Sequence, residues 1–422
     1  MKKIIIAIVA VLFIAIVSPK FIGQIVETEH QSMLENINEQ VVTVKSKNFT
    51  RSWFGAKATT EIIVHLNNPA LDDFSLTINE NLSFGPVIFA EDGIHFGLSY
   101  SDIKLDLGLE NDEKANEFLN NNIHLSWLLS FASNVTTYIA IDEYVSDLDY
   151  KKVIISPASG QFTMTANNRL YGDFNWQGIT LSDNNDVILK DLSFALDQEL
   201  IRGSYADGDA VSTGTFSLMI DELEIVETNN KPVANFKGIS FSTTAKEIAE
   251  MLQIGLNYHV NSFDVDGQHF EQANIAIKLE KLDIETMQAF SKIASKLDDK
   301  KEQSQIVLNE LTALAGRLIA KEPVLKIEDV SVLTPQGKIV MLATAQFDKN
   351  KFDAQNMMTA MVALQVNGQV TAPVAFFAEG VKKNAVDMYL QQGLLIQEGE
   401  QLKSKITFKD GKLTINDNVI PL

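Results

Sequence analysis

The hexapeptide Phe236-Lys-Gly-Ile239-Ser-Phe241 shows a pattern that recurs along this chain: apolar, two mostly polar residues, apolar, polar, apolar. A strand with strict alternation would change face after the additional polar residue and turn half of its apolar side chains toward water. A β-bulge absorbs one such residue while bending and twisting the strand. The pattern therefore predicts strands that carry a bulge near their middle.

Related hexapeptides occur in most parts of the chain. They begin at Leu71, Trp176, Leu189, Ile220, Val260, Leu279 and Ile327. Any β-rich protein contains some of them by chance, but the number of matches favours true repetition. We therefore predict a series of related hairpins that build a long, curved antiparallel sheet.

A helical pattern interrupts the strands between residues 284 and 321. Its apolar residues recur at helical spacing and are divided by the charged stretch Asp298–Glu302, which predicts a helical hairpin. Shorter helices are expected at residues 245–252, 356–361 and 380–395. Near the end, Asp410-Gly411 predicts a tight turn between two strands, residues 402–408 and 412–415.

The N-terminus has an apolar run from Ile4 to Val17 behind Lys2 and Lys3. It is typical of either a cleaved signal peptide or an uncleaved anchor. The candidate cleavage positions around Ala15, Val17 and Ser18 are poor, and a second apolar patch extends the segment to a length that spans a bilayer, which favours the anchor. Lysines before it and acids after it predict a cytoplasmic N-terminus. The predicted anchor residues are Ile4, Ile8, Leu12, Phe13, Ile16, Val17, Phe21 and Ile22.

The predicted fold class is α+β, mainly β. The expected parts are a transmembrane anchor (1–26), a helical stalk (27–47), a β-rich body (48–283), the helical hairpin insertion (284–321) and a C-terminal β-rich segment with helices (322–422). Together they predict a single-pass bacterial inner-membrane protein whose body lies in the periplasm.

Composition excludes several classes of function. The formal net charge is −20 without a basic cluster, which argues against nucleic acid as a partner. The chain has no cysteine, so disulfides, thiolate nucleophiles and an acylated lipoprotein cysteine are excluded. No phosphate-binding glycine loop, nucleophile elbow or metalloprotease helix is present.

The remaining candidate groups favour structural roles. His259 and His269 could meet across a hairpin, but we expect a packed or solvated pair rather than a metal site. We therefore predict neither an enzyme nor a cofactor. The 24 phenylalanines could form a strand core or line a lipid groove, and the sequence leaves both alternatives open.

Three segments resemble the YdgA-like family of bacterial membrane-anchored periplasmic proteins. They are residues 49–56 (Phe-Thr-Arg-Ser-Trp-Phe-Gly-Ala), residues 84–87 (Phe-Gly-Pro-Val) and the ending from Leu394 to Asn416. Ser52, Phe84 and Val87 depart from the family pattern, which has Gly, His and Phe there. The resemblance implies an inner-membrane anchor, a periplasmic body and no known activity or cofactor. We expect packing roles for the family-motif residues Arg51, Trp53, Phe54, Gly55, Gly85 and Pro86.

Three functional hypotheses follow. The first is a non-enzymatic envelope protein whose curved sheet binds lipid or another apolar envelope component. The second is a dimeric scaffold or interaction protein that uses the helices of residues 284–321 or the sheet edges. The third is a hydrolase with an unrecognised site, which would need converging Asp, His or Ser side chains.

Overall fold

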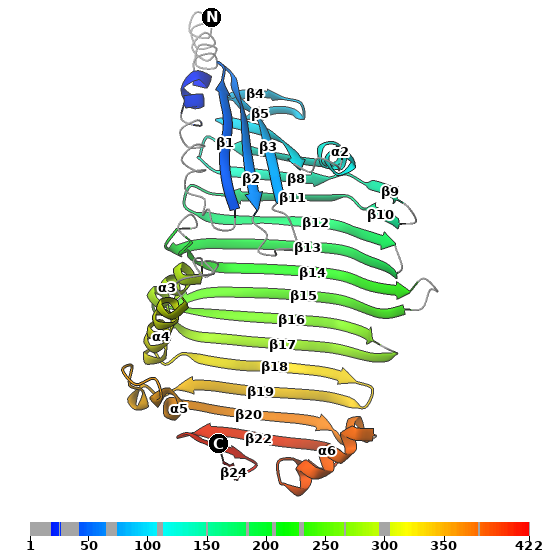
Figure 1. Ribbon diagram of the computed structural model, residues 1–422, viewed down its shortest axis with the longest axis vertical. Helices are drawn as coiled ribbons and strands as arrows, with labels where there is room; N and C mark the ends of the chain where they lie inside the picture. The colour runs from blue at the N-terminus through cyan, green and yellow to red at the C-terminus, as the bar shows by residue number, and fades with distance from the viewer. Residues whose placement is uncertain are drawn as a thin grey trace, which may run out of the picture. The chain divides into compact units, whose positions relative to one another are not determined.

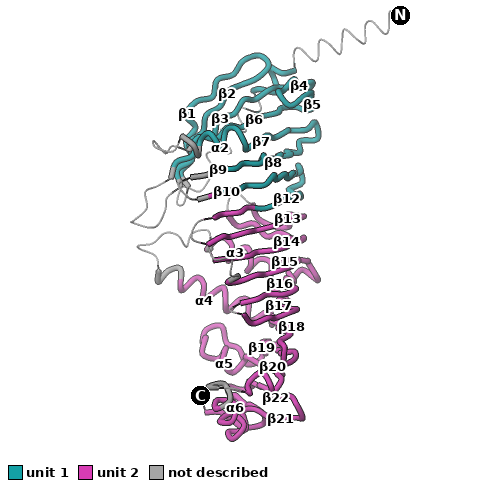
Figure 2. The backbone as a smooth tube through the Cα atoms, turned by 90° about the vertical axis from the view of Figure 1, so that its right-hand side faces the viewer, with its two compact units in different colours: residues 1–146, 153–178, 205–207 teal, residues 147–152, 179–204, 208–422 magenta. Residues whose placement is uncertain are grey.

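The computed structural model describes residues 18–24, 26, 42–64, 74–107, 113–148, 151–182, 185–204, 208–227, 232–265, 267–294, 304–378 and 380–421. The chain divides into two compact units, drawn in different colours in Figure 2. Unit 1 comprises residues 1–146, 153–178 and 205–207, and unit 2 comprises residues 147–152, 179–204 and 208–422. Both units are mainly β, as Figure 1 shows, which confirms the predicted class.

Unit 1 is an antiparallel meander in which most strands pair with their neighbours in sequence. In pairing order its strands are β1 (Val42–Arg51), β2 (Gly55–Val64), β3 (Phe74–Phe84), β6 (Ser99–Leu107), β7 (Ile123–Leu129), β8 (Val135–Ile141), β11 (Ala158–Met164) and β12 (Arg169–Ser182). A separate hairpin, β4 (Val87–Ala90) and β5 (Gly93–Phe96), is inserted between β3 and β6. Helix α2 (Glu113–Asn122) precedes β7. Parts of β9 (Tyr144–Leu148), of β10 (Lys151–Ile155) and of the end of β12 belong to unit 2.

Unit 2 is a second antiparallel meander with longer strands. Its main strands are β13 (Asn185–Arg202), β14 (Val211–Glu227), β15 (Pro232–Ile248), β16 (Met251–Val265), β17 (Gln268–Asp283), β18 (Val324–Thr334), β19 (Gly337–Phe347), β20 (Leu364–Pro373) and β22 (Gln401–Lys409). Short strands follow at its end: β21 (Ile396–Glu398), β23 (Lys412–Ile415) and β24 (Asn418–Ile420). Its helices are α3 (Ile284–Ala294), α4 (Ser304–Ala320), η1 (Lys349–Lys351), α5 (Thr359–Ala363), η2 (Val374–Phe377) and α6 (Gly380–Gln391).

The hexapeptides are sites of strand irregularity, as predicted. Register shifts occur beside Lys281 and between Ile327 and Val330, where one strand has an additional residue. At the third position of four hexapeptides the backbone has a positive φ: Gly178 (130°), Asp191 (49°), Gly238 (60°) and Lys281 (58°). A residue in this conformation interrupts the alternation of the strand. The repeated pattern therefore located irregular strand positions correctly. An additional residue on one strand occurs at the hexapeptides of Leu279 and Ile327, whereas the pairing keeps its register across Asp191 and Gly238.

One predicted helix, and the end of the predicted stalk, form strands instead. Residues 245–252 form the end of β15, a turn at Ala249 and Glu250, and the start of β16. Their helix propensity is a weak preference, and pairing of Lys246 with Gln253 and of Ile248 with Met251 outweighs it. The predicted stalk is wrong at its end, because residues 42–47 belong to β1. Residues 27–41, the rest of the stalk, lie outside the described residues.

Other helices occur within the residue ranges predicted for them. α3 and α4 lie within residues 284–321, and α6 lies within residues 380–395. α5 begins at Thr359 and overlaps only the end of its predicted segment, because residues 353–358 form turns.

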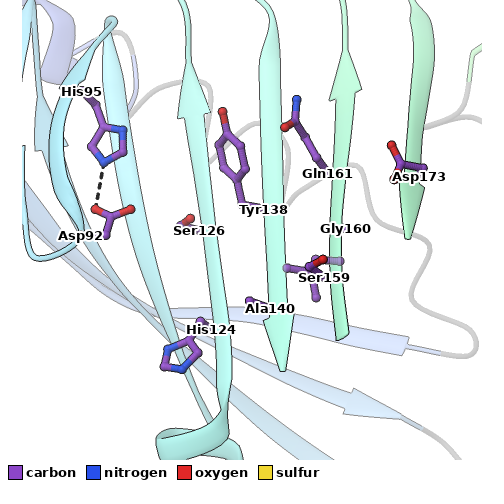
Figure 3. Close-up of a pocket in the computed structure, with 11 residues that line it drawn as sticks. Asp92, His95, His124, Ser126, Tyr138, Ala140, Ser159, Gly160, Gln161 and Asp173 are labelled. Carbon is purple, nitrogen blue, oxygen red and sulfur yellow. Dashed lines mark hydrogen bonds and ion pairs between the residues drawn. The ribbon is translucent and has the colours of Figure 1, made fainter. Parts of the chain in front are cut away.

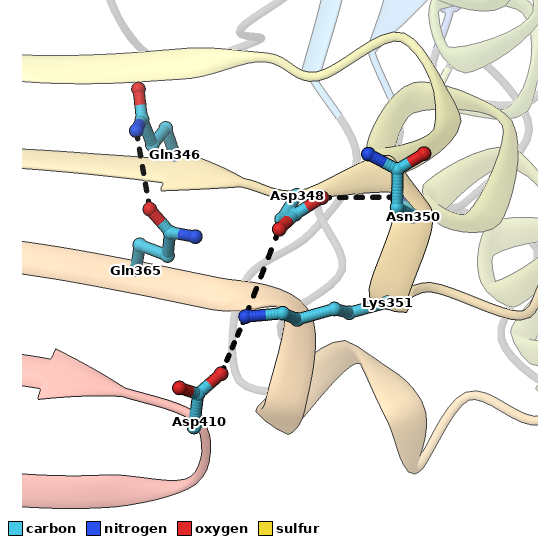
Figure 4. Close-up of polar contacts among 6 residues, drawn as sticks. All are labelled: Gln346, Asp348, Asn350, Lys351, Gln365 and Asp410. Carbon is cyan, nitrogen blue, oxygen red and sulfur yellow. Dashed lines mark hydrogen bonds and ion pairs between the residues drawn. The ribbon is translucent and has the colours of Figure 1, made fainter.

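The predicted Asp-Gly turn joins β22 to β23. Asp410 and Gly411 both have positive φ, at 55° and 72°, as a two-residue hairpin turn requires. Figure 4 shows that Lys351, from η1, reaches this turn and forms an ion pair with Asp410 at 2.6 Å. The ammonium of Lys351 lowers the pKa of Asp410 below its ordinary value. The contact thus ties two loops that are far apart in sequence.

Each unit has its own apolar core cluster. In unit 1, Ala56, Ala58, Leu82 and Phe84 are buried together with Val26. In unit 2, Val211, Leu252 and Leu282 are buried and contact Met287 of α3 and Leu318 of α4. The helical hairpin therefore packs on one end of the long strands.

The N-terminal helical residues pack on the unit 1 core. Residues 18–24 are helical, and Ile22 and Val26 lie against the cluster of Ala56, Leu82 and Phe84. The sequence placed both in the anchor of residues 1–26, whereas here protein covers them. No helix among the described residues is long and apolar enough to cross a membrane. The predicted anchor residues Ile4, Ile8, Leu12, Phe13, Ile16 and Val17 lie outside the described part of the chain.

Candidate functional site

One face of unit 2 carries aligned rows of apolar side chains, which we call the apolar face. Cross-strand pairing from β13 to β17 places the members of each row directly opposite one another. The first row is Leu192, Ile220, Ile239, Val260 and Ala273. The second row, two residues along each strand, is Phe194, Leu218, Phe241, Tyr258 and Ile275.

A third row lies on the other side of the positions where the regular pairing is interrupted. It consists of Leu189, Leu223, Phe236, Phe263 and Phe270. Between it and the first row the regular pairing skips one position on every strand, at Asp191, Asp221, Gly238, Asn261 and Gln272. Three of these residues, on alternate strands, have positive φ. Because the alternation is reversed at this position, the third row shares the apolar face with the other two.

The aromatic rings of this face contact one another but are not buried. Phe236, Phe263 and Phe270 form a stack with ring centroids 5.9 and 4.8 Å apart. Phe216 lies between Phe194 and Phe241, at 6.3 and 6.2 Å. All six rings remain partly exposed, and Tyr258 and Ile275 are 37% and 41% exposed. Apart from Val260, which is 3% exposed, the side chains of the three rows are therefore partly accessible to solvent.

The surroundings limit where such a ligand could lie. At one end of the strands α3 and α4 cover the continuation of the face at Leu252 and Leu282. The opposite face of the same strands is mostly polar, with Ser193, Met219, Ser240, His259 and Asn274 in one row. The sheet is thus strongly two-sided, and only one side suits an apolar ligand.

The two histidines singled out in the sequence do not pair. His259 hydrogen-bonds the side-chain oxygens of Asn274 and Asn261 at 2.6 and 2.7 Å. His269 lies opposite Asp264 and forms ion pairs with it and with Glu271. Hydrogen bonds to these two carboxylates raise the pKa of His269 above its ordinary value. Within the described residues, no group of three or more His, Asp or Glu side chains could hold a metal ion.

The family-motif residues gather around the β1–β2 turn and the start of the β4–β5 hairpin. Arg51 ends β1, and Trp53 and Phe54 occupy the turn, 45% and 56% exposed. A Cβ on Gly55 would lie 2.3 Å from the carbonyl oxygen of Leu82, and one on Gly85 would lie 1.6 Å from that of Gly97. Backbone therefore passes too close to both glycines for a side chain. These close contacts are a physical reason for glycine at both positions.

A cavity of about 520 Å³, lined by both polar and apolar residues, lies on unit 1 (Figure 3). Ser126 of β7, Tyr138 of β8, Gln161 of β11 and Asp173 of β12 form one cross-strand row along it. His95 and Asp92, from the β4–β5 hairpin, border the same cavity. Its lining of carboxylates, an amide, hydroxyls and imidazoles could form hydrogen bonds with a polar ligand.

The hairpin residues at this cavity form a hydrogen-bonded group. Asp92 accepts a hydrogen bond from the hydroxyl of Tyr100 at 2.8 Å and contacts Nε2 of His95 at 2.8 Å. The rings of His95 and Tyr100 are stacked, with centroids 4.2 Å apart. Burial, together with the carboxylate of Asp92, raises the pKa of Tyr100 to about 12. Burial alone would raise the pKa of Asp92, but hydrogen bonds from His95 and Tyr100 outweigh it and lower that pKa.

Imidazoles bonded to carboxylates occur at two places around this cavity. Nε2 of His95 contacts Asp92, and Nε2 of His124 contacts Asp142 at 2.9 Å. The stacking of His95 on Tyr100 and the hydrogen bond from Tyr100 to Asp92 hold the hairpin on the sheet.

Two features escaped the sequence reasoning. The rows of the apolar face depend on the register of five strands, which no local pattern specifies. The β4–β5 hairpin did have a local signal, because the apolar run Val87 to Ala90 precedes the turn residues Asp92-Gly93, and Ile94 and Phe96 alternate with His95 after them.

Comparison with known proteins identifies the family alone. No curated protein and no solved structure has significant similarity to this chain. One family model, described as a bacterial protein of unknown function (DUF945), matches residues 1–422. The chain therefore belongs to the DUF945 family of bacterial proteins.

Proposed function

We propose that this protein is a non-enzymatic component of the bacterial envelope that binds lipid on the apolar face of unit 2. Phenylalanine, leucine and isoleucine side chains that remain partly exposed lie in register across β13 to β17 and support this proposal. A core would bury such residues, since each gains about 1.5–3 kcal/mol on full burial. Their exposure favours an apolar ligand that completes the surface.

An acyl chain suits this face better than a compact ligand. The rows follow the direction across the strands, and five strands spaced about 4.8 Å apart give an apolar path of roughly 20 Å. Transfer of a methylene group from water to an apolar site is favourable by about 0.8 kcal/mol. A chain of methylene groups lying along the rows would therefore gain affinity with its length.

Membrane tethering is the second part of the proposal. The apolar run Ile4–Val17 behind Lys2 and Lys3 favours an uncleaved inner-membrane anchor with the N-terminus in the cytoplasm and the body in the periplasm. The resemblance to the YdgA-like family agrees with this placement. A lipid-binding body held at the membrane surface would be close to its ligand.

Lipid extraction from the purified full-length chain, followed by mass spectrometry, tests the proposal. We expect phospholipid or another acyl lipid to remain bound after extensive detergent washing, at a constant ratio to protein across preparations. A chain that is free of lipid and that crosslinks as a dimer in whole cells would contradict it. That result would favour the alternative of a dimeric scaffold.

A further inference from the structure

The β4–β5 hairpin presents four large apolar side chains to solvent. Val87 pairs with Phe96, and Phe89 pairs with Ile94, so all four lie on one face of the hairpin. They are 39%, 65%, 76% and 60% exposed in that order. Isolated exposed apolar residues are common on proteins, but four together on one short hairpin indicate an interaction surface.

The opposite face of the hairpin holds it firmly on unit 1. Ile88 is buried to 1% exposure, and His95 stacks on Tyr100 of β6. Asp92, in the turn, bonds to both of these aromatic residues. The hairpin therefore has a defined orientation, and its apolar face is held outward.

The base of the hairpin adjoins the segment that leads to the apolar N-terminus. The amide of Phe84 donates to the carbonyl oxygen of Phe54 at 2.8 Å, and the ring of Phe84 lies against Gly23. Figure 1 places the hairpin at the same end of unit 1 as the short helix of residues 18–24, drawn in dark blue. Lys20 lies over the ring of Trp53 at 5.1 Å, and Phe21 is 62% exposed. Exposed aromatic residues beside a lysine are typical of the membrane–water interface.

We propose that the β4–β5 hairpin lies in the headgroup region of the membrane that the N-terminal segment enters, with Val87, Phe89, Ile94 and Phe96 facing lipid. This inference depends on the membrane tethering proposed above. Strands of four residues are too short to cross a bilayer, which needs about 9–11 residues per strand, so the contact is interfacial. It gives the body a second membrane contact, which fixes its orientation rather than leaving it on a single tether.

Site-specific fluorescence in vesicles tests the proposal, and the cysteine-free chain makes it direct. Phe89→Cys and Ile94→Cys variants of the full-length protein would each be labelled with an environment-sensitive dye. They would then be reconstituted into vesicles of phosphatidylethanolamine and phosphatidylglycerol. Met358→Cys, at a residue 78% exposed in unit 2, is the matched control. Circular dichroism checks that each variant is folded.

We expect blue-shifted emission at both hairpin positions and several-fold quenching by lipids that carry a quencher near the headgroup, with no change at the control. Vesicle-bound protein whose hairpin labels match the control would overturn the hairpin contact while leaving the tether intact. Protein that fails to float with the vesicles would overturn both. A blue shift that appears without vesicles and rises with protein concentration would instead identify a second copy of the chain as the occupant.

Discussion

Replacement of Phe241 by aspartate is expected to remove most of the lipid bound to the purified protein. Phe241 lies in the middle of the second row, opposite Leu218 and Tyr258, with its ring 6.2 Å from that of Phe216. A carboxylate there would have to lose its hydration to contact an acyl chain, at a cost of several kcal/mol without a compensating partner. Since about 1.4 kcal/mol is a tenfold change in affinity, occupancy should fall at least tenfold.

The neighbouring residue provides a matched control. Ser240 follows Ile239 on the same strand but lies on the polar face, opposite Met219 and His259. Ser240→Asp introduces the same charge in the same strand and should leave lipid content unchanged. Equal loss from both variants would show that charge disturbs the sheet in general, and equal retention would place the lipid elsewhere.

Gly85→Ala is expected to be the most destabilising single-methyl change in unit 1. The new Cβ would lie 1.6 Å from the carbonyl oxygen of Gly97, and the Gly85 amide donates to the carbonyl of Leu98 at 2.8 Å. Because both sides of this contact are backbone, the two chain segments at the base of the hairpin must move apart. We expect a loss of roughly 3 kcal/mol or more in the free energy of unfolding, at the upper end of overpacking effects.

Tryptophan fluorescence during urea unfolding measures this change. All three tryptophans, Trp53, Trp127 and Trp176, belong to unit 1, so their signal reports that unit. Gly316→Ala in α4 of unit 2 is the control, because its Cβ would make only ordinary contacts, the nearest at 3.7 Å. That variant should leave the tryptophan transition unchanged. A Gly85→Ala transition at the wild-type urea concentration would contradict the packing role of this motif.

The sequence predicted local features more accurately than long-range ones. The repeated hexapeptide located irregular strand positions correctly, because an interrupted alternation can be recognised from consecutive residues such as Leu279 to Ile284. The Asp410-Gly411 turn and the helices α3 and α4 were found for the same reason. Residues 245–252 were misread because helix-favouring residues there are held in strands by partners on β14 and β16.

The candidate site was less accessible from sequence. Whether a phenylalanine belongs to a core or to a groove depends on which other residues cover its ring in the folded chain. In the sequence, Phe194, Phe241 and Phe263 cannot be distinguished from core residues. Their partial exposure appears only once five strands are in register and α3 and α4 cover one end alone. The contact of Ile22 and Val26 with unit 1 could not be predicted either, because an apolar sequence alone does not distinguish a segment covered by lipid from one covered by protein.

The most direct test of the lipid-binding claim is photocrosslinking in living cells from a single residue on each face of unit 2. A photoreactive amino acid would replace either Tyr258, on the apolar face, or Met219, which is 54% exposed on the polar face. We expect the residue at position 258 to become attached to an acyl lipid, identified by mass spectrometry of the modified peptide, whereas the residue at position 219 should not. Attachment at neither position, or equally at both, would contradict it.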